Sequence, residues 1–221
     1  RATTFLHPEY SLQTRLGAAH FFNRGVFLAS GYEDNLIKAA ASDASAEVRM
    51  AAASGLKRVK SEQSYAALQD ILKSDSDHRV RVNAIRALQG YPFEKAKPVF
   101  LLALNDKNVN VAIAASEVIK NIPDQSEDWT KKITPTMNWR VRSNLYEAAL
   151  LVDVDDELME EVKKNYAASS NEYEKAALLK ALSKNVKSFS FIKEELVSSG
   201  SLLQKTSAAQ AIVDINRNSR F

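Results

Sequence analysis

The chain has 221 residues, a net charge of +3, and 45% hydrophobic and 26% charged residues, which is ordinary usage for a folded protein. It has no cysteine, which excludes disulfides, thiolate metal sites and cysteine nucleophiles. Six glycines and five prolines are few for this length and favour helices over strands and turns. No apolar run approaches the roughly 18 residues of a membrane span. Because the chain starts at Arg1 rather than methionine, we expect a fragment of a larger protein.

One pattern recurs along the chain. An apolar anchor residue is followed by Arg, then by Ala four places after the anchor, then by small or apolar residues seven and eight places after it; residues 48–56 and 80–88 show it most clearly. The copies begin at Thr14, Val48, Val80, Val111, Val141, Glu174 and Gln204. The intervals are 34, 32, 31, 30, 33 and 30 residues, and this regularity predicts a repeat protein.

Positions four, seven and eight after the anchor (offsets four, seven and eight) fall on one face of an α-helix. Offset four holds Ala18, Ala52, Ala84, Ala115, Leu145, Leu178 and Ala208. Offset eight holds Phe22, Leu56, Leu88, Ile119, Ala149, Leu182 and Ile212. The many alanines let neighbouring helices approach closely, so these faces are the predicted core.

Further apolar stretches lie between these helices. They are residues 65–72, 99–104, 158–166 and 191–197, each long enough for two to three helical turns. The turns at 74–77 and 105–108 are rich in Asp, Ser and Asn, which suit helix N-caps. Each repeat is thus a two-helix hairpin that buries its apolar face by stacking. We predict an all-α fold, a right-handed α-α superhelix of about six to seven hairpins, forming a single domain over residues 1–221.

These residues carry a family resemblance. An acidic residue ahead of Val-Arg, with Ala and Leu at fixed offsets, resembles the second helix of HEAT repeats. The resemblance covers the chain from about Ser11 to Asn216. The short period is similar to that of phycobilisome-lyase-like proteins. The resemblance implies a ladder of ion pairs between adjacent repeats. Its predicted members are Arg15, Arg49, Arg81 and Arg142, with Asp43, Asp75 and Asp106. The acidic position is Thr136, Ser169 and Ser199 in the last three repeats, where we expect the ladder to lapse.

HEAT second helices line the concave side of the solenoid, so offsets three, six and ten should be exposed there. This surface is basic in the first three repeats and acidic near Glu117 and Glu147. Because a nucleic-acid track needs continuous positive charge, the mixed surface favours a protein or peptide partner. We expect partner contacts at His20, Arg24, Arg58 and Arg86.

Two enzymatic alternatives remain open. HEAT-like alkylpurine DNA glycosylases use Trp, Asp and Arg around an extruded base, and this chain has such residues near one another. They are Asp128, Trp129, Trp139, Arg140 and Arg142. The family's paired Trp-Trp-Asp arrangement is missing, and packing explains both tryptophans. A chromophore-lyase-like function would need a tetrapyrrole site, for which no residues stand out.

No metal site, cofactor or catalytic group is predicted, because the three histidines lie apart in the sequence and no nucleophile or phosphate-loop motif occurs. Residues 78–88 and 173–182 are similar to the HEAT region of bacterial envelope proteins that also carry a cyclophilin-type prolyl isomerase domain. The cyclophilin signatures themselves are missing here. That resemblance implies a non-enzymatic scaffold in the cell envelope or periplasm, and without it we expect the cytoplasm.

Overall fold

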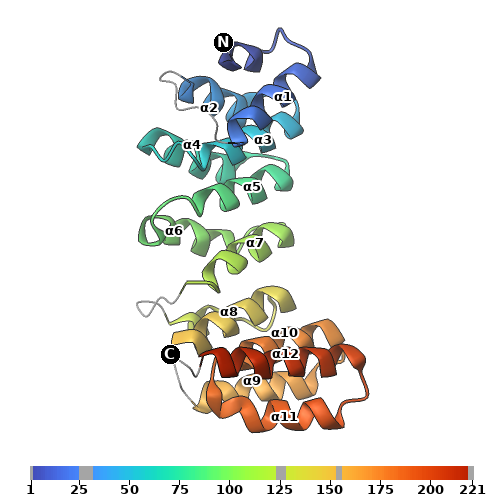
Figure 1. Ribbon diagram of the computed structural model, residues 1–221. Coiled ribbons are helices and arrows are strands. Elements are labelled where there is room, and N and C mark those ends of the chain that lie inside the picture. The colour runs from blue at the N-terminus through green and yellow to red at the C-terminus, as the bar shows by residue number, and fades with distance from the viewer. Residues whose placement is uncertain (1, 25–31, 123–127, 153–155, 219–221) are drawn as a thin grey trace. The chain divides into compact units, whose positions relative to one another are not determined.

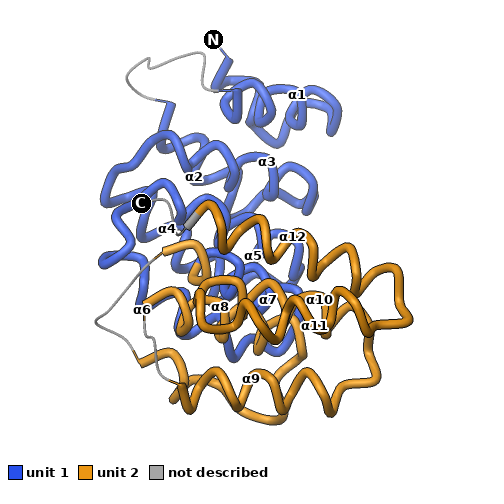
Figure 2. Tube along the Cα trace, turned by 60° about the horizontal axis from the view of Figure 1, so that its bottom comes forward, with its two compact units in different colours: residues 1–118 blue, residues 119–221 orange. Residues whose placement is uncertain are grey.

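The computed structural model describes residues 2–24, 32–122, 128–152 and 156–218, and within these ranges its regular elements are helices (Figure 1). Contacts group the chain into two compact units, residues 1–118 and 119–221 (Figure 2). The predicted all-α fold of stacked helical hairpins is confirmed within each unit. A single domain over residues 1–221 stays a prediction.

Unit 1 consists of a short 3₁₀ turn, a first helix and three hairpins. Its elements are η1 (Ala2–Leu6), α1 (Leu12–Asn23), α2 (Glu33–Ser42), α3 (Ala46–Leu56), α4 (Glu62–Ser74), α5 (His78–Leu88), α6 (Phe93–Ala103) and α7 (Val109–Ile119), whose last residue falls in unit 2. Helix α3 packs between α1 and α5, while α2 packs on α4, so the helices form two layers (Figure 1).

Unit 2 repeats this arrangement. Its elements are η2 (Trp129–Lys132), α8 (Trp139–Val152), α9 (Asp156–Ala168), α10 (Glu172–Leu182), η3 (Val186–Ser188), α11 (Phe189–Ser198) and α12 (Leu202–Asn218). Helix α10 packs between α8 and α12, and α11 packs on α12. The seven anchors therefore lie on α1, α3, α5, α7, α8, α10 and α12.

The predicted core is confirmed at nearly every position. All seven offset-four residues are buried, with exposed fractions from 0% to 8%. Offset eight is buried in the first six repeats and half-buried only at Ile212. Alanine at offset four keeps the second helices close, so each helix covers its neighbour's apolar face.

The four predicted apolar stretches lie in α4, α6, α9 and α11, except that Leu104 follows the end of α6 as its C-cap. The turn residues cap as expected: the Asp77 side chain accepts from the Arg79 amide at 2.8 Å, at the start of α5. Helix α2 was missed, because its Ala-rich end lacks the large apolar side chains that mark the other first helices. Ahead of α8, the described residues contain only the single turn of η2, so this repeat departs from the hairpin pattern.

None of the helices in the described residues combines the length and apolar character that crossing a membrane requires.

Candidate protein-binding groove

The ladder arginines of unit 1 each contact the next repeat. The Nε atoms of Arg15, Arg49 and Arg81 lie 2.8, 2.8 and 3.0 Å from an oxygen of Asp43, Asp75 and Asp106, respectively. In each pair Nη2 donates to the second carboxylate oxygen, which gives a bidentate ion pair. Nη1 donates to a backbone carbonyl in the turn before the arginine's own helix, at Tyr10, Asp43 and Asp75. The guanidinium groups are therefore engaged inside the stack and do not form an open phosphate-binding stripe.

The aspartates of the ladder also organise their own turns. One carboxylate oxygen of each accepts the backbone N–H two residues later, in Ser45, Asp77 and Asn108. For Asp106, burial alone would raise the pKa, yet the bonds from Arg81 and from the Asn108 amide outweigh it and leave the pKa below its ordinary value. The paired aspartates raise the pKa values of Arg49 and Arg81. The Arg81–Asp106 pair therefore stays ionised at neutral pH.

Unit 2 continues the ladder with a different acid. Arg142 Nη2 lies 2.7 Å from Glu174 Oε1, and Glu174 is the anchor residue of α10 rather than a turn residue. We expected the ladder to lapse at Ser169, but Glu174 supplies the acid in its place. The Ser169 hydroxyl donates to the same carboxylate at 2.9 Å. In the following repeat the cation at the ladder position, Lys175, lies 4.9 Å from the centre of the Tyr166 ring.

A groove of about 320 Å³ crosses α3, α5 and α7 on the second-helix layer of unit 1. Its lining residues are Met50, His78, Arg79, Val82, Asn83, Arg86, Asn110, Ile113, Ala114 and Glu117. Most come from matching offsets of successive repeats: Met50, Val82 and Ile113 from offset two, Asn83 and Ala114 from offset three, Arg86 and Glu117 from offset six. The groove therefore follows the repeat, with a half-buried apolar column along its floor and polar groups at its edges.

One side-chain hydrogen bond between α3 and α5, oriented by a second bond within α5, holds a wall of this groove. The Ser54 hydroxyl of α3 bonds Asn83 Oδ1 of α5 at 2.9 Å, and Asn83 Nδ2 donates to the Arg79 carbonyl at 2.8 Å. These contacts fix α3 relative to α5, so the groove is a preformed surface.

The sequence predicted offsets three and six as groove positions but missed the apolar column at offset two. Its signal was present, since Met50, Val82 and Ile113 are apolar at one offset outside the core set. All four expected contact residues, His20, Arg24, Arg58 and Arg86, are exposed, and only Arg86 lines this groove. Arg58 instead donates from Nε to the Asn23 carbonyl at 3.1 Å, at the end of α1.

The expectation that offsets three and six are exposed was wrong at three positions. Ala51 and Ala114 at offset three are each 4% exposed, because these small residues lie between packed helices. Glu147 at offset six is only 3% exposed, because lysines from neighbouring segments cover its carboxylate.

The residues of the glycosylase alternative do not form a base pocket. Trp129 is 1% exposed and packs in the core. Asp128 caps η2 by accepting from the Thr130 amide at 3.1 Å, and Arg142 is bound to Glu174. Trp139 is half-buried, with the Arg140 guanidinium 5.1 Å from its ring centre. This alternative is not favoured.

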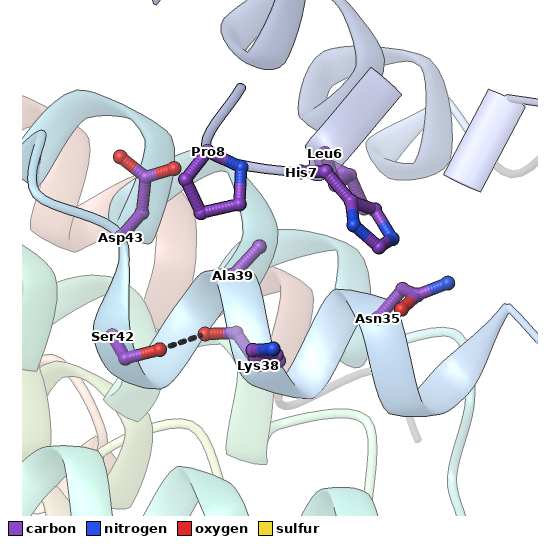
Figure 3. A pocket seen from close by; sticks show the side chains of 8 residues that line it. All are labelled: Leu6, His7, Pro8, Asn35, Lys38, Ala39, Ser42 and Asp43. Carbon is purple, nitrogen blue, oxygen red and sulfur yellow. Dashed lines mark hydrogen bonds between the residues drawn. The ribbon is translucent and has the colours of Figure 1, made fainter. Parts of the chain in front are cut away.

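Unit 1 also contains a small hollow and an outer groove. The small hollow, about 40 Å³, lies between the turn after η1 and α2, where His7 and Pro8 face Asn35, Ala39 and Asp43 (Figure 3). It has room for one or two water molecules. An outer groove of about 460 Å³ lies between α2 and α4, over the Arg49–Asp75 pair. Among the described residues, no set of three or more His, Cys, Asp or Glu side chains could hold a metal ion.

Comparisons with known proteins agree with the repeat pattern. Residues 30–89 match the family model of HEAT repeats. Among solved structures, the chain is similar to the complex of CpcE and CpcF of phycocyanin lyase from Nostoc sp. PCC7120. The TM-score is 0.55 at 17% identity, over 97% of this chain and 93% of that one. No curated protein sequence matches the chain significantly. The structural similarity extends the HEAT-type fold over nearly the whole chain.

Proposed function

We propose that this chain is a protein-interaction scaffold, and that the groove across α3, α5 and α7 holds an extended or helical segment of a partner protein. The observation that carries the proposal is the repetition of lining residues: offset two contributes from all three second helices, and offsets three and six contribute from both α5 and α7. A surface that repeats with the fold presents the same kinds of contact several times, which suits a linear ligand.

The chemistry of the groove supports a protein ligand. Apolar side chains at its floor and polar side chains at its edges resemble the core and rim of protein interfaces. Arg79 and Arg86 line it together with Glu117, so its charge is mixed. A phosphodiester backbone would be repelled by Glu117, whereas a partner segment with both charges would be matched.

The similar solved structure is a complex of two chains, CpcE and CpcF, and this supports a role in a protein assembly. We further propose that the segment acts as a binding module without catalytic activity of its own. The finer hypothesis is that it belongs to a larger bacterial protein with a prolyl isomerase domain. The neighbouring open reading frame tests this directly: an isomerase signature beside the repeats supports it, and its absence contradicts it.

Site-specific photo-crosslinking tests the scaffold proposal. A photoreactive phenylalanine analogue at Asn83 places the probe in the groove, and the same analogue at Asp70, exposed on α4, places it at the outer groove. We expect the Asn83 probe to form a covalent adduct with one protein from the source cells, and the Asp70 probe to form none. Arg86→Ala should then weaken binding of that purified partner about tenfold, as expected for a central contact.

Adducts from Asp70 alone would move the site to the outer groove and contradict the proposal. Equal affinity of the Arg86→Ala variant and the wild-type protein for the purified partner would also contradict the proposal. Salt-dependent retention on DNA that is lost with Arg86→Ala would favour a nucleic-acid ligand instead.

A second candidate function is suggested by the similarity to the phycocyanin lyase complex, which covers 97% of this chain. A lyase-like role would require the chain to bind a linear tetrapyrrole. Titration with such a pigment should shift its absorption bands if the candidate is correct. Unchanged bands at micromolar protein would eliminate it.

A further inference from the structure

Unit 2 contains a buried acid surrounded by lysines. Glu147 of α8 is 3% exposed, and its carboxylate oxygens lie 3.8 Å from Lys120 Nζ, 3.9 Å from Lys180 Nζ and 3.1 Å from Lys184 Nζ. Lys120 Nζ also donates to Asn144 Oδ1 at 3.0 Å. We call Lys120, Lys180 and Lys184 the inner lysine cluster.

The repeat explains why these groups meet. Glu147 and Lys180 stand at offset six of α8 and α10, so they lie on matching faces of two helices that pack together, and Lys184 stands at offset ten, two residues beyond the end of α10. In unit 1, the groove lies on the equivalent layer of second helices. Lys180 is exposed on this layer, where a ligand can reach it.

The charges of Lys180, Lys184 and Glu147 do not balance. In the described part of the chain, Glu147 is the one carboxylate within ion-pair distance of either Lys180 or Lys184. Two ammonium groups share it, so at least one positive charge is not compensated. The Lys180 side chain is 54% exposed and that of Lys184 23% exposed, while Glu147 beneath them is not accessible. An incoming anion would therefore meet the ammonium groups rather than the buried acid.

We propose that the inner lysine cluster binds acidic side chains of a protein partner, and that Glu147 serves to position the lysines. A buried carboxylate holds both ammonium groups within 4 Å of one oxygen atom, Oε1, which concentrates positive charge on a small area. Lysine ammonium groups are point charges that bind single carboxylate or phosphate oxygens, so the surroundings of the cluster decide which anion it suits.

The positive charge does not continue along the repeats. The equivalent residues of α12 are Gln210 at offset six and Asp214 at offset ten, which hydrogen bond each other at 2.9 Å. A nucleic-acid backbone would need cations at regular spacing along its path. A confined positive site next to a neutral and an acidic residue fits a short acidic peptide segment better.

This inference rests on the proposed scaffold function, because it names the chemistry of a protein ligand, but it concerns different residues. Fluorescence anisotropy with a labelled octaglutamate peptide and the full chain tests it. The variant is Lys180→Ala with Lys184→Ala. The matched control is Lys164→Ala with Lys193→Ala, which removes the same charge from exposed positions on α9 and α11.

We expect the cluster variant to bind the peptide about tenfold more weakly than wild type at low salt, and the control variant to change affinity less than about twofold. Equal losses in both variants would show attraction to overall charge and overturn the proposal. Tighter binding of a labelled octathymidine strand through the same two lysines would overturn it in favour of nucleic acid. No peptide binding by wild type would also overturn it, while the crosslinking result at Asn83 would still decide the scaffold proposal.

Discussion

Each ladder arginine joins two neighbouring repeats and closes the turn ahead of its own helix. The fork of the guanidinium supplies this combination, since Nε and Nη2 bind the aspartate of the next repeat while Nη1 binds a backbone carbonyl. The aspartates are largely buried; the side chain of Asp75 is 5% exposed. Removing an arginine therefore leaves a buried acid without its partner.

Arg49→Ala should lower the free energy of unfolding by about 3 kcal/mol, because Asp75 would remain buried and unpaired. Arg49→Lys should have an intermediate effect, since a single ammonium group cannot make all three bonds. Urea denaturation followed by circular dichroism measures both. As a control, Arg79→Ala removes an exposed arginine paired with Asp77 and should leave the transition midpoint nearly unchanged. Equal midpoints for Arg49→Ala and Arg79→Ala would contradict the structural role of the ladder.

The ladder also predicts a pH dependence. The pKa of Asp106 is lowered in the folded state, so the folded protein binds fewer protons there than the unfolded chain. The stabilisation is present above the unfolded pKa of about 3.9 and is lost as the pH falls through the lower folded value. The free energy of unfolding of the wild-type protein should thus decline below about pH 4. The Asp106→Asn variant should be less stable at neutral pH, and its free energy of unfolding should decline less steeply below pH 4. Denaturation curves at several pH values measure this. If the free energies of unfolding of the two proteins fell in parallel with pH, the role of Asp106 in the pH dependence would be refuted.

At the scale of the helix, offset five marks the face that packs on the next repeat. Offset five is buried in the first six repeats, with exposed fractions from 0% to 3%. These residues are Ala19, Ala53, Ile85, Ser116, Tyr146 and Leu179. In α12 the same position, Ala209, is exposed. The same substitution should therefore have different effects in α3 and in α12.

Ala53→Asp should destabilise the protein by about 3–5 kcal/mol, because it buries an unpaired carboxylate. Ala209→Asp should cost only about 0.5 kcal/mol, the difference in helix propensity. Thermal unfolding of the two variants gives the comparison. A strong destabilisation by Ala209→Asp would show that this face of α12 is covered, contrary to the structure.

The sequence predicted the second helices well because one face of each carries a strong signal. Small or apolar residues at offsets four, seven and eight are dictated by close helix packing, and they locate α3 and α5 to within a few residues. Side chains whose environment depends on other repeats could not be predicted this way. Glu147 is polar at a position that periodicity assigns to solvent, and only the lysines that fold over it explain its burial. Likewise Glu174 pairs with Arg142 from a position that no local pattern marks as acidic.

Across the whole molecule, seven repeats follow one register. In every repeat, offset four faces the helices packed against it. Offset six faces the ligand side or the solvent, with Glu147 as the exception already described. The proposed groove and the inner lysine cluster both depend on this register, because a shift by one residue would move their side chains into the core.

Single-cysteine accessibility measures this register most directly, because the chain contains no cysteine of its own. Matched pairs are Ala84→Cys with Arg86→Cys in α5, and Ala208→Cys with Gln210→Cys in α12. In the native protein, we expect the thiols introduced by Ala84→Cys and Ala208→Cys to react with a chromogenic disulfide reagent about a hundredfold more slowly than those of their matched variants. All four thiols should react alike after unfolding in urea. Equal native rates within either pair would contradict the repeat register and the surfaces built on it.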